Sequence, residues 1–171
     1  MTNFELFYDT SGVCTDTRNI QKDCLFVCLK GANFNGNEFA LEALNQGAKY
    51  VIVDEFISDA PSSIIRVENA LIYLQQLANY HRHKFQLPII GITGSNGKTT
   101  SKELIAAVLS KKYNVHYTKG NLNNHIGVPL TLLQLNSTHE IAVIEMGANK
   151  FNDIEELCAI AEPTHGIITN I

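Results

Sequence analysis

The segment Gly91-Ile92-Thr93-Gly94-Ser95-Asn96-Gly97-Lys98-Thr99-Thr100 constrains the fold of this chain more than any other part of the sequence. It follows the apolar residues 88–92 and precedes an amphipathic stretch at 101–110, which predicts a strand, a tight turn and a helix. This is the setting of a phosphate-binding loop, in which glycines let successive backbone N–H groups point at one anion. The helix adds the positive end of its dipole.

The residue types in this loop suit ATP and magnesium. Lys98 provides a mobile positive charge for the β- and γ-phosphates, and the Thr99 hydroxyl is suited to bind Mg²⁺. The glycines depart from the usual Walker spacing, because Ile92 stands where the first glycine is expected. A glycine-rich turn with a chance Gly-Lys-Thr is the alternative, and the agreement of strand, turn, lysine and helix disfavours it. The residues expected to bind ATP are Gly94, Ser95, Asn96, Gly97, Lys98, Thr99 and Thr100.

An acidic residue at the end of a neighbouring strand is the usual second metal ligand of such a loop. Four apolar residues, 141–144, predict a buried strand that delivers Glu145 to its carboxyl end, where open α/β sheets bind ligands. A surface glutamate at a strand end is the alternative, and the buried run before it favours the metal role. Residues 149–152, Asn-Lys-Phe-Asn, resemble a guanine-binding Asn-Lys-x-Asp motif but lack its carboxylate, so ATP is favoured over GTP.

Short apolar runs and helical periodicities alternate along the rest of the chain. This alternation predicts an α/β fold with mainly parallel sheets covered by helices. The expected strands are residues 25–29, 50–53, 64–67, 88–92, 114–117, 141–144 and 166–169, and the expected helices are 38–46, 69–83, 101–110, 129–135 and 153–160. Asn152 with Glu155 three residues later predicts a capping box at the start of the last helix. His81 and His83 are two apart on a helix, so they do not form a metal pair and are expected to be solvated or partly packed.

Composition excludes several functional classes. The 171 residues are 45% hydrophobic and 18% charged, which is typical of a globular protein, and the net charge of −4 gives no basic field for nucleic acid or a membrane surface. No apolar run approaches the length of a membrane span, and no secretory signal is visible. The four cysteines match no zinc or redox spacing, so we expect reduced thiols and a cytoplasmic protein.

Several motifs together resemble the Mur ligase family. The loop at 91–100 is similar to the family's T-G-x-x-G-K-[ST], which folylpolyglutamate synthase shares, and residues 120–131 resemble G-N-x-N-N-x-I-G-x-P-L-T. Residues 144–149, 15–18 and 29–36 are also similar to family elements, in the same order along nearly the whole chain. Asn35 and Asn37 depart from the family, which often has Asp and His at those positions, and both lie outside the phosphate site.

The resemblance implies two domains and a two-step ligase reaction. Residues 1–85 would be an α/β domain that binds the UDP end of a UDP-N-acetylmuramoyl-tripeptide, and residues 86–171 would be part of the central ATPase domain. The family member with these motifs uses ATP to activate the peptide carboxylate as an acyl phosphate, which the amine of D-alanyl-D-alanine attacks. Lys98 and Glu145 would be catalytic, and Thr99 and Glu145 would bind Mg²⁺. The substrate-binding residues would be Thr17, Arg18, Lys30, Gly31, Asn33, Phe34, Asn123 and Asn124.

The resemblance also implies a third, C-terminal domain beyond residue 171, so we expect this chain to be the front of a larger ligase, monomeric and inactive alone. A stand-alone nucleotide-binding module without turnover, or another Mur-type or folylpolyglutamate-type ligase, is the alternative. A polar turn before a helix is the alternative role of Asn123 and Asn124. His125 is expected to make a polar contact, and His165 to lie at the surface or cap a strand.

Overall fold

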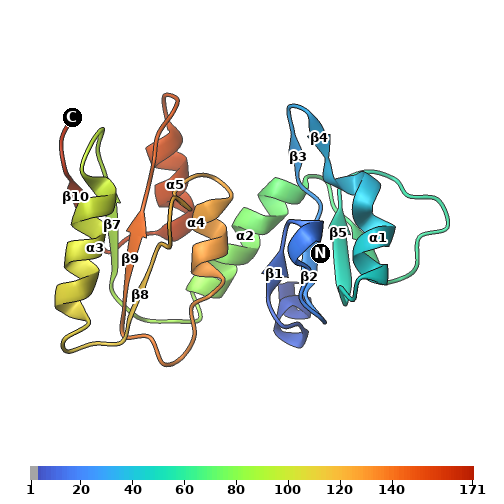
Figure 1. Cartoon of the computed structure of the whole chain (residues 1–171), viewed down its shortest axis with the longest axis horizontal. Helices are drawn as coiled ribbons and strands as arrows, with labels where there is room; N and C mark the ends of the chain where they lie inside the picture. The colour runs from blue at the N-terminus through green and yellow to red at the C-terminus, as the bar shows by residue number, and fades with distance from the viewer. Residues whose placement is uncertain (1–3) are drawn as a thin grey trace. The chain divides into compact units, whose positions relative to one another are not determined.

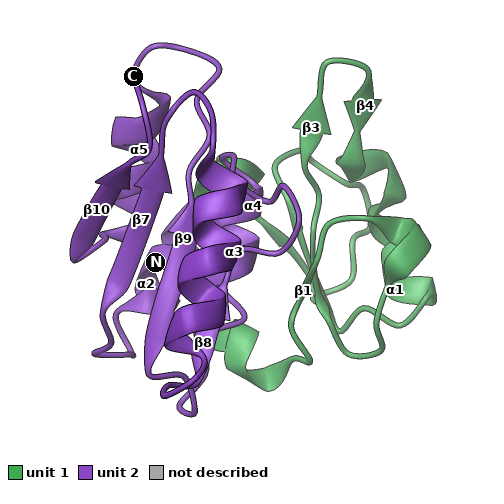
Figure 2. Cartoon of the chain, turned by 60° about the vertical axis from the view of Figure 1, so that its left-hand side comes forward, with its two compact units in different colours: residues 1–74 green, residues 75–171 purple. Residues whose placement is uncertain are grey.

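The computed structural model describes residues 4–171 of the chain. It divides into two compact units, residues 1–74 and 75–171, and each is built around its own parallel sheet (Figure 2). This confirms the mixed α/β class with mainly parallel strands. The unit boundary falls within one helix, whereas the sequence places a domain boundary after residue 85, and that division stays a prediction.

The first unit contains a four-stranded parallel sheet in the order β1-β2-β5-β6. Its core lies between this sheet and α1, where Phe26, Val51 and Ala43 are at most 2% exposed. The elements are η1 (Phe4–Asp9), β1 (Val13–Cys14), η2 (Thr17–Asn19), β2 (Leu25–Val27), β3 (Lys30–Gly31), β4 (Phe34–Asn35), η3 (Gly36–Phe39), α1 (Ala40–Asn45), β5 (Tyr50–Val53), β6 (Ile64–Arg66) and the start of α2 (Ala70–Arg82) (Figure 1).

The second unit contains another four-stranded parallel sheet, in the order β10-β7-β9-β8. Helices α3, α4 and α5 pack against it, and β7 and β9 are central strands. The elements are β7 (Ile89–Thr93), α3 (Lys98–Leu109), β8 (Val115–Tyr117), α4 (Gly127–Leu132), β9 (Ile141–Glu145), α5 (Asp153–Ala161) and β10 (His165–Ile168) (Figure 1). Central strands buried on both faces explain the continuous apolar runs in the sequence.

The expected strands and helices all occur, with bounds shifted by about three residues or fewer, which is the ordinary uncertainty of helix and strand ends. The prediction of a capping box at the start of α5 is wrong. Asn152 has a φ of 72° and its side chain makes no capping bond. Asp153 instead accepts hydrogen bonds at Oδ2 from the backbone N–H groups of Asn149 and Lys150, at 2.8 and 2.9 Å. Asp153 thus ties the preceding loop to the first residue of α5, and the helix start has no side-chain cap from Asn152.

His81, near the end of α2, and His83, just after it, have different environments, so they form no metal pair. His81 is only 4% exposed, and its Nε2 lies 2.9 Å from the carbonyl oxygen of Leu135, which is deeper than a solvated or partly packed ring. The Nε2 of His83 lies 3.1 Å from Oε1 of Glu162. Within residues 4–171, no helix is both long enough and apolar enough to cross a membrane.

Candidate functional site

The loop between β7 and α3 has a backbone that requires glycine at two positions. Gly94 has a φ of +137° and Gly97 a φ of +79°, both in the region that other residues rarely adopt. A Cβ atom on Gly94 would collide with Oγ1 of Thr169 and lie 2.9 Å from the carbonyl oxygen of Asn170. The loop therefore combines a left-handed turn with close approach of the chain after β10, which explains why its glycines stand at 94 and 97 despite the unusual Walker spacing.

Two side chains, those of Lys98 and Asn170, make polar contacts with this loop. The Lys98 ammonium group donates to the carbonyl oxygens of Gly94 and Ser95, at 2.6 and 3.4 Å. The Oδ1 atom of Asn170 accepts a hydrogen bond from the Asn96 backbone N–H at 2.8 Å and one from the Ser95 hydroxyl at 3.3 Å. The loop thus places a backbone donor that already holds an oxygen acceptor close to a cation, and such a combination suits a phosphate.

Glu145 lies at the carboxyl end of β9, beside the start of α3. Its side chain is 1% exposed, and its Oε1 atom accepts hydrogen bonds from Thr99 Oγ1 at 3.1 Å and Asn123 Nδ2 at 2.9 Å. The register pairs Glu145 with Ile92 of β7, so the acid and the phosphate loop follow adjacent strands. The structure brings together Thr99, Glu145 and Asn123, three residues far apart in the sequence.

These side chains fit a hard divalent cation. The Thr99 hydroxyl and the Glu145 carboxylate present oxygen atoms, the ligand type that Mg²⁺ prefers. The Oε2 atom of Glu145 is buried and accepts no hydrogen bond. Thr99 and Glu145 are therefore the residues that would hold a magnesium ion.

Lys102 is a residue of this site that the sequence analysis did not single out. It is 0% exposed, and its ammonium group lies 3.5 Å from Glu145 Oε2. A signal existed, because residues 102 and 106 occupy the buried stripe of α3 and a lysine stands where an apolar residue is typical.

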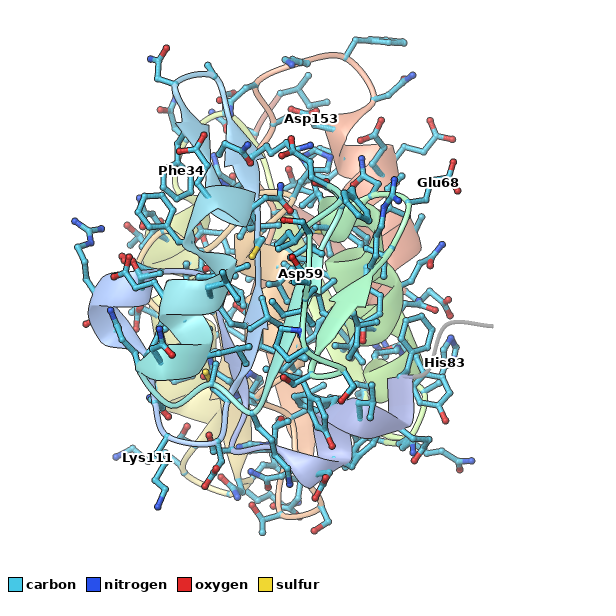
Figure 3. All side chains as sticks on the ribbon, turned by 90° about the vertical axis from the view of Figure 1, so that its right-hand side faces the viewer. Phe34, Asp59, Glu68, His83, Lys111 and Asp153 are labelled. Carbon is cyan, nitrogen blue, oxygen red and sulfur yellow. The ribbon has the colours of Figure 1, made fainter. Side chains whose placement is uncertain are left out.

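The first unit has a hollow of about 490 Å³ beside the β3–β4 hairpin. The Phe34 and Phe39 rings stack there, with centroids 5.5 Å apart and an interplanar angle of 13°. Phe34 is 52% exposed and lies at the outer edge of the hairpin (Figure 3). Exposed aromatic rings beside polar groups suit a planar base. The lining residues are Lys30, Gly31, Ala32, Asn33, Phe34, Asn35, Glu38 and Phe39, which include four of the expected substrate residues.

A charged network fixes the hairpin. The Lys30 ammonium group lies 2.9 Å from Asp54 and 3.0 Å from Glu55. Asn37 donates to Asp54 Oδ1 at 2.9 Å, and Asn35 donates to Glu55 Oε2 at 3.1 Å. Burial alone would raise the pKa of Asp54, but hydrogen bonds from Lys30 and Asn37 outweigh it and lower that pKa. The two asparagines that depart from the family pattern thus hold the acids that anchor Lys30.

Thr17 and Arg18 lie elsewhere in the first unit, on η2, and are not among the residues that line the hollow. Arg18 contacts Asp16 through its guanidinium, 2.6 Å from Oδ2, and this pairing lowers the pKa of Asp16 to about 2. Both side chains are exposed, with 85% of the Arg18 side chain and 38% of the Asp16 side chain accessible. The expected substrate contact of Thr17 and Arg18 stays a prediction.

The remaining polar candidates have local partners. Asn124 accepts hydrogen bonds at Oδ1 from the N–H groups of Ile126 and Gly127, which places it at the start of α4 rather than beside Glu145. The Nε2 of His125 lies 2.7 Å from Oε2 of Glu156, so His125 contacts a carboxylate within its own unit. His165 is exposed, and its Nδ1 lies 2.9 Å from the Thr164 hydroxyl. Only Asn123 of the Asn-Asn pair reaches the candidate metal site.

Comparison with known proteins gives matches along most of the chain. The profile described as Mur ligase family, catalytic domain, matches residues 9–82, and the Mur ligase middle domain matches residues 92–171. A UDP-N-acetylmuramoyl-tripeptide–D-alanyl-D-alanine ligase from Synechocystis is 44% identical over 100% of this chain and 38% of its own length. The ligase of the same name from Bacillus subtilis is also 44% identical, over 94% of this chain and 35% of its own length.

Solved structures agree with these matches. MurF from Acinetobacter baumannii superposes with a TM-score of 0.90 at 34% identity, over 99% of this chain and 41% of that one. MurF ligase from Thermotoga maritima in complex with ADP gives 0.88 at 34% identity, over 100% of this chain and 39% of that one. The chain spans 35–38% of the length of the two curated relatives named above. Since both profiles and the fold agree along the chain, this protein belongs to the Mur ligase family.

Proposed function

We propose that this chain supplies the nucleotide site and part of the substrate site of an ATP-dependent ligase of bacterial peptidoglycan synthesis. The reaction joins D-alanyl-D-alanine to UDP-N-acetylmuramoyl-tripeptide. The observation that carries the proposal is the cluster of Thr99, Glu145 and Asn123 beside a glycine-dependent phosphate loop. The names of the relatives, and the ADP held by one structural neighbour, support it.

The chemistry follows from the loop. Lys98 would leave the carbonyl oxygens of Gly94 and Ser95 and turn to the phosphates of ATP, while the Asn96 N–H group donates to a phosphate oxygen in place of Asn170. A peptide carboxylate oxygen attacks the γ-phosphorus, so that an acyl phosphate forms and ADP leaves. The amine of D-alanyl-D-alanine then attacks the acyl carbon, loses a proton and expels phosphate. Such transfer depends mainly on positioning and charge neutralisation.

Magnesium enters this proposal through Thr99 and Glu145, the residues that would hold it. When bound, the ion neutralises charge on the phosphates. Asn123 fixes Glu145 through its hydrogen bond to Oε1 and so keeps the acid at the loop. The proposal includes a monomer acting in the bacterial cytoplasm, where ATP and the nucleotide-linked substrate are found.

The hollow of the first unit would receive the UDP end of the substrate. The stacked rings of Phe34 and Phe39 offer a face for uracil, and Lys30 offers a cation for the diphosphate. Lys30 is already paired with Asp54 and Glu55, which fixes its position and partly offsets its charge. Positioning by fixed polar groups is what nucleotide pockets commonly use.

The substitution Lys98→Ala tests the division into two sites. We expect ATP binding to be lost and binding of UDP-N-acetylmuramoyl-tripeptide to be retained, because Lys98 lies in the second unit and donates to the carbonyl oxygens of its own loop. Titration calorimetry with each ligand measures both. Lys111→Met is the matched control, since Lys111 is exposed and projects away from the fold (Figure 3). Loss of both ligands in Lys98→Ala would show that the two-site division is wrong.

A further inference from the structure

Lys102 is a fully buried lysine on α3, and the neighbouring residues of the same helical turn are exposed or half-buried. Its side chain is 0% exposed, and Lys102 and Ala106 are the buried residues of α3. Its ammonium group lies 3.1 Å from Glu103 Oε1, 3.4 Å from the carbonyl oxygen of Gly120 and 3.5 Å from Glu145 Oε2. Lysine is almost never fully buried unless it is paired with an opposite charge. The burial of Lys102 therefore depends on these partners.

The two oxygen atoms of Glu145 have different surroundings. Oε1 accepts hydrogen bonds from Thr99 and Asn123, on the side of the phosphate loop. Oε2 is buried and accepts no hydrogen bond, and the ammonium group of Lys102 is the cation beside it. A buried carboxylate without a compensating charge is strongly disfavoured. Lys102 therefore balances the charge of Glu145 from the side away from Thr99.

Lys102 also connects the elements that form the candidate metal site. It stands on α3, one turn after Lys98, and it donates to Gly120 in the segment that leads to Asn123. Through Glu145 it reaches the end of β9. One side chain thus touches three segments whose polar groups meet at Glu145 Oε1.

We infer that Lys102 is a positioning residue for the nucleotide-bound metal: it holds the Glu145 carboxylate so that Oε1 faces Thr99. The inference rests on the proposed function, because it assumes that Thr99 and Glu145 bind the cation that accompanies ATP. A role in folding alone is the competing explanation, since the same contacts join three segments of the fold. The two explanations predict different effects of substituting Lys102 on the gain in nucleotide affinity that Mg²⁺ provides.

The test compares ADP binding by this chain with Mg²⁺ and with EDTA, measured by calorimetry. The ratio of the two dissociation constants is the metal-dependent increment. In Lys102→Met we expect the increment to fall about tenfold or more, as is typical when a partner of a metal ligand is removed, while ADP binding in EDTA stays nearly unchanged. A role in folding alone predicts that both conditions change together, or that neither does.

Control variants separate the charge of Lys102 from its packing. Glu103→Gln removes the exposed partner of Lys102 and should leave the increment unchanged, and so should Lys111→Met. Glu145→Gln should lose the increment. Lys102→Gln also removes the charge but keeps a polar side chain, and it should lower the increment in the same way, so it keeps the test valid if Lys102→Met fails to fold.

Each outcome decides one of the claims. An unchanged increment in Lys102→Met, or in Lys102→Gln where Lys102→Met does not fold, overturns the inference and leaves the proposed function standing. If the unaltered chain binds ADP neither with nor without Mg²⁺, the proposed nucleotide site and the inference both fail.

Discussion

The two candidate sites differ in how they are built. The site beside the phosphate loop consists of buried groups: Glu145 and Lys102 are 1% and 0% exposed, and each is held by partners from other elements. The hollow of the first unit is open, and its Phe34 ring and Lys30 side chain are 52% and 42% exposed. A site that stabilises charge on phosphates and a metal ion requires preorganised groups shielded from water. An open site can bind a base by stacking on an exposed ring.

The phosphate loop should be the less tolerant of the two regions. In Gly94→Ala, the new Cβ collides with Oγ1 of Thr169 and the backbone has a φ of +137°, which costs about 1–3 kcal/mol in strain. We expect ADP affinity to fall about a hundredfold, measured by calorimetry alongside thermal unfolding. Gly166→Ala is the control, because a Cβ there meets nothing within 4 Å. Equal ADP affinity in the two variants would show that the loop backbone is not rigid.

The open hollow should respond to substitution without a loss of stability. Phe34→Ala removes a ring that stacks on Phe39, and we expect the affinity for UDP-N-acetylmuramoyl-tripeptide to fall about tenfold, as for loss of base stacking. Thermal unfolding should change little, since Phe34 is 52% exposed. Phe56→Ala is a suitable control, because Phe56 is 75% exposed and does not line the hollow. Unchanged affinity in Phe34→Ala would move the UDP site elsewhere.

Acid should weaken the network behind the hollow by a smaller amount. The pKa of Asp54 is lowered in the folded chain, so its contribution to stability is present above about pH 4, the unfolded value, and is lost as pH falls through the folded pKa. We expect the stability difference between the unaltered chain and Asp54→Asn, less than about 1 kcal/mol, to shrink between pH 7 and pH 3. Urea unfolding followed by circular dichroism measures this difference. A difference that is constant with pH would contradict the role of Lys30 in lowering the pKa.

The same contrast decides what could be predicted from the sequence. The loop at 91–100 and the apolar run before Glu145 carry local patterns, and they predicted the adjacency of β7, α3 and β9 that the structure shows. The β3 and β4 strands have two residues each, too few for an alternating pattern, so the sequence did not predict the hairpin, and the family resemblance marked the segment only as a substrate loop. Short strands are fixed by neighbours rather than by their own residues.

Two residues show why contacts between distant segments cannot be predicted from the sequence alone. Lys102 stands at an apolar position of its helix, but only the assembled sheet shows that it faces Glu145. Asn124 matches a family motif as well as Asn123 does, but its side chain is used at the start of α4. Motif similarity identified the segment, but only the folded structure shows which of the two side chains reaches Glu145.

The contact of Asn170 with the phosphate loop has a thermodynamic consequence. Its Oδ1 atom accepts from the Asn96 N–H group at 2.8 Å, the donor that a phosphate oxygen would use. Asn170 is therefore an intramolecular competitor, present at a high effective concentration because it is tethered to the same chain. The measured nucleotide affinity would equal the intrinsic affinity reduced by the fraction of molecules in which Asn170 holds the loop. Such a competitor would keep the loop amide satisfied when the nucleotide site is empty, so nucleotide release would cost less than it would from an unsatisfied donor.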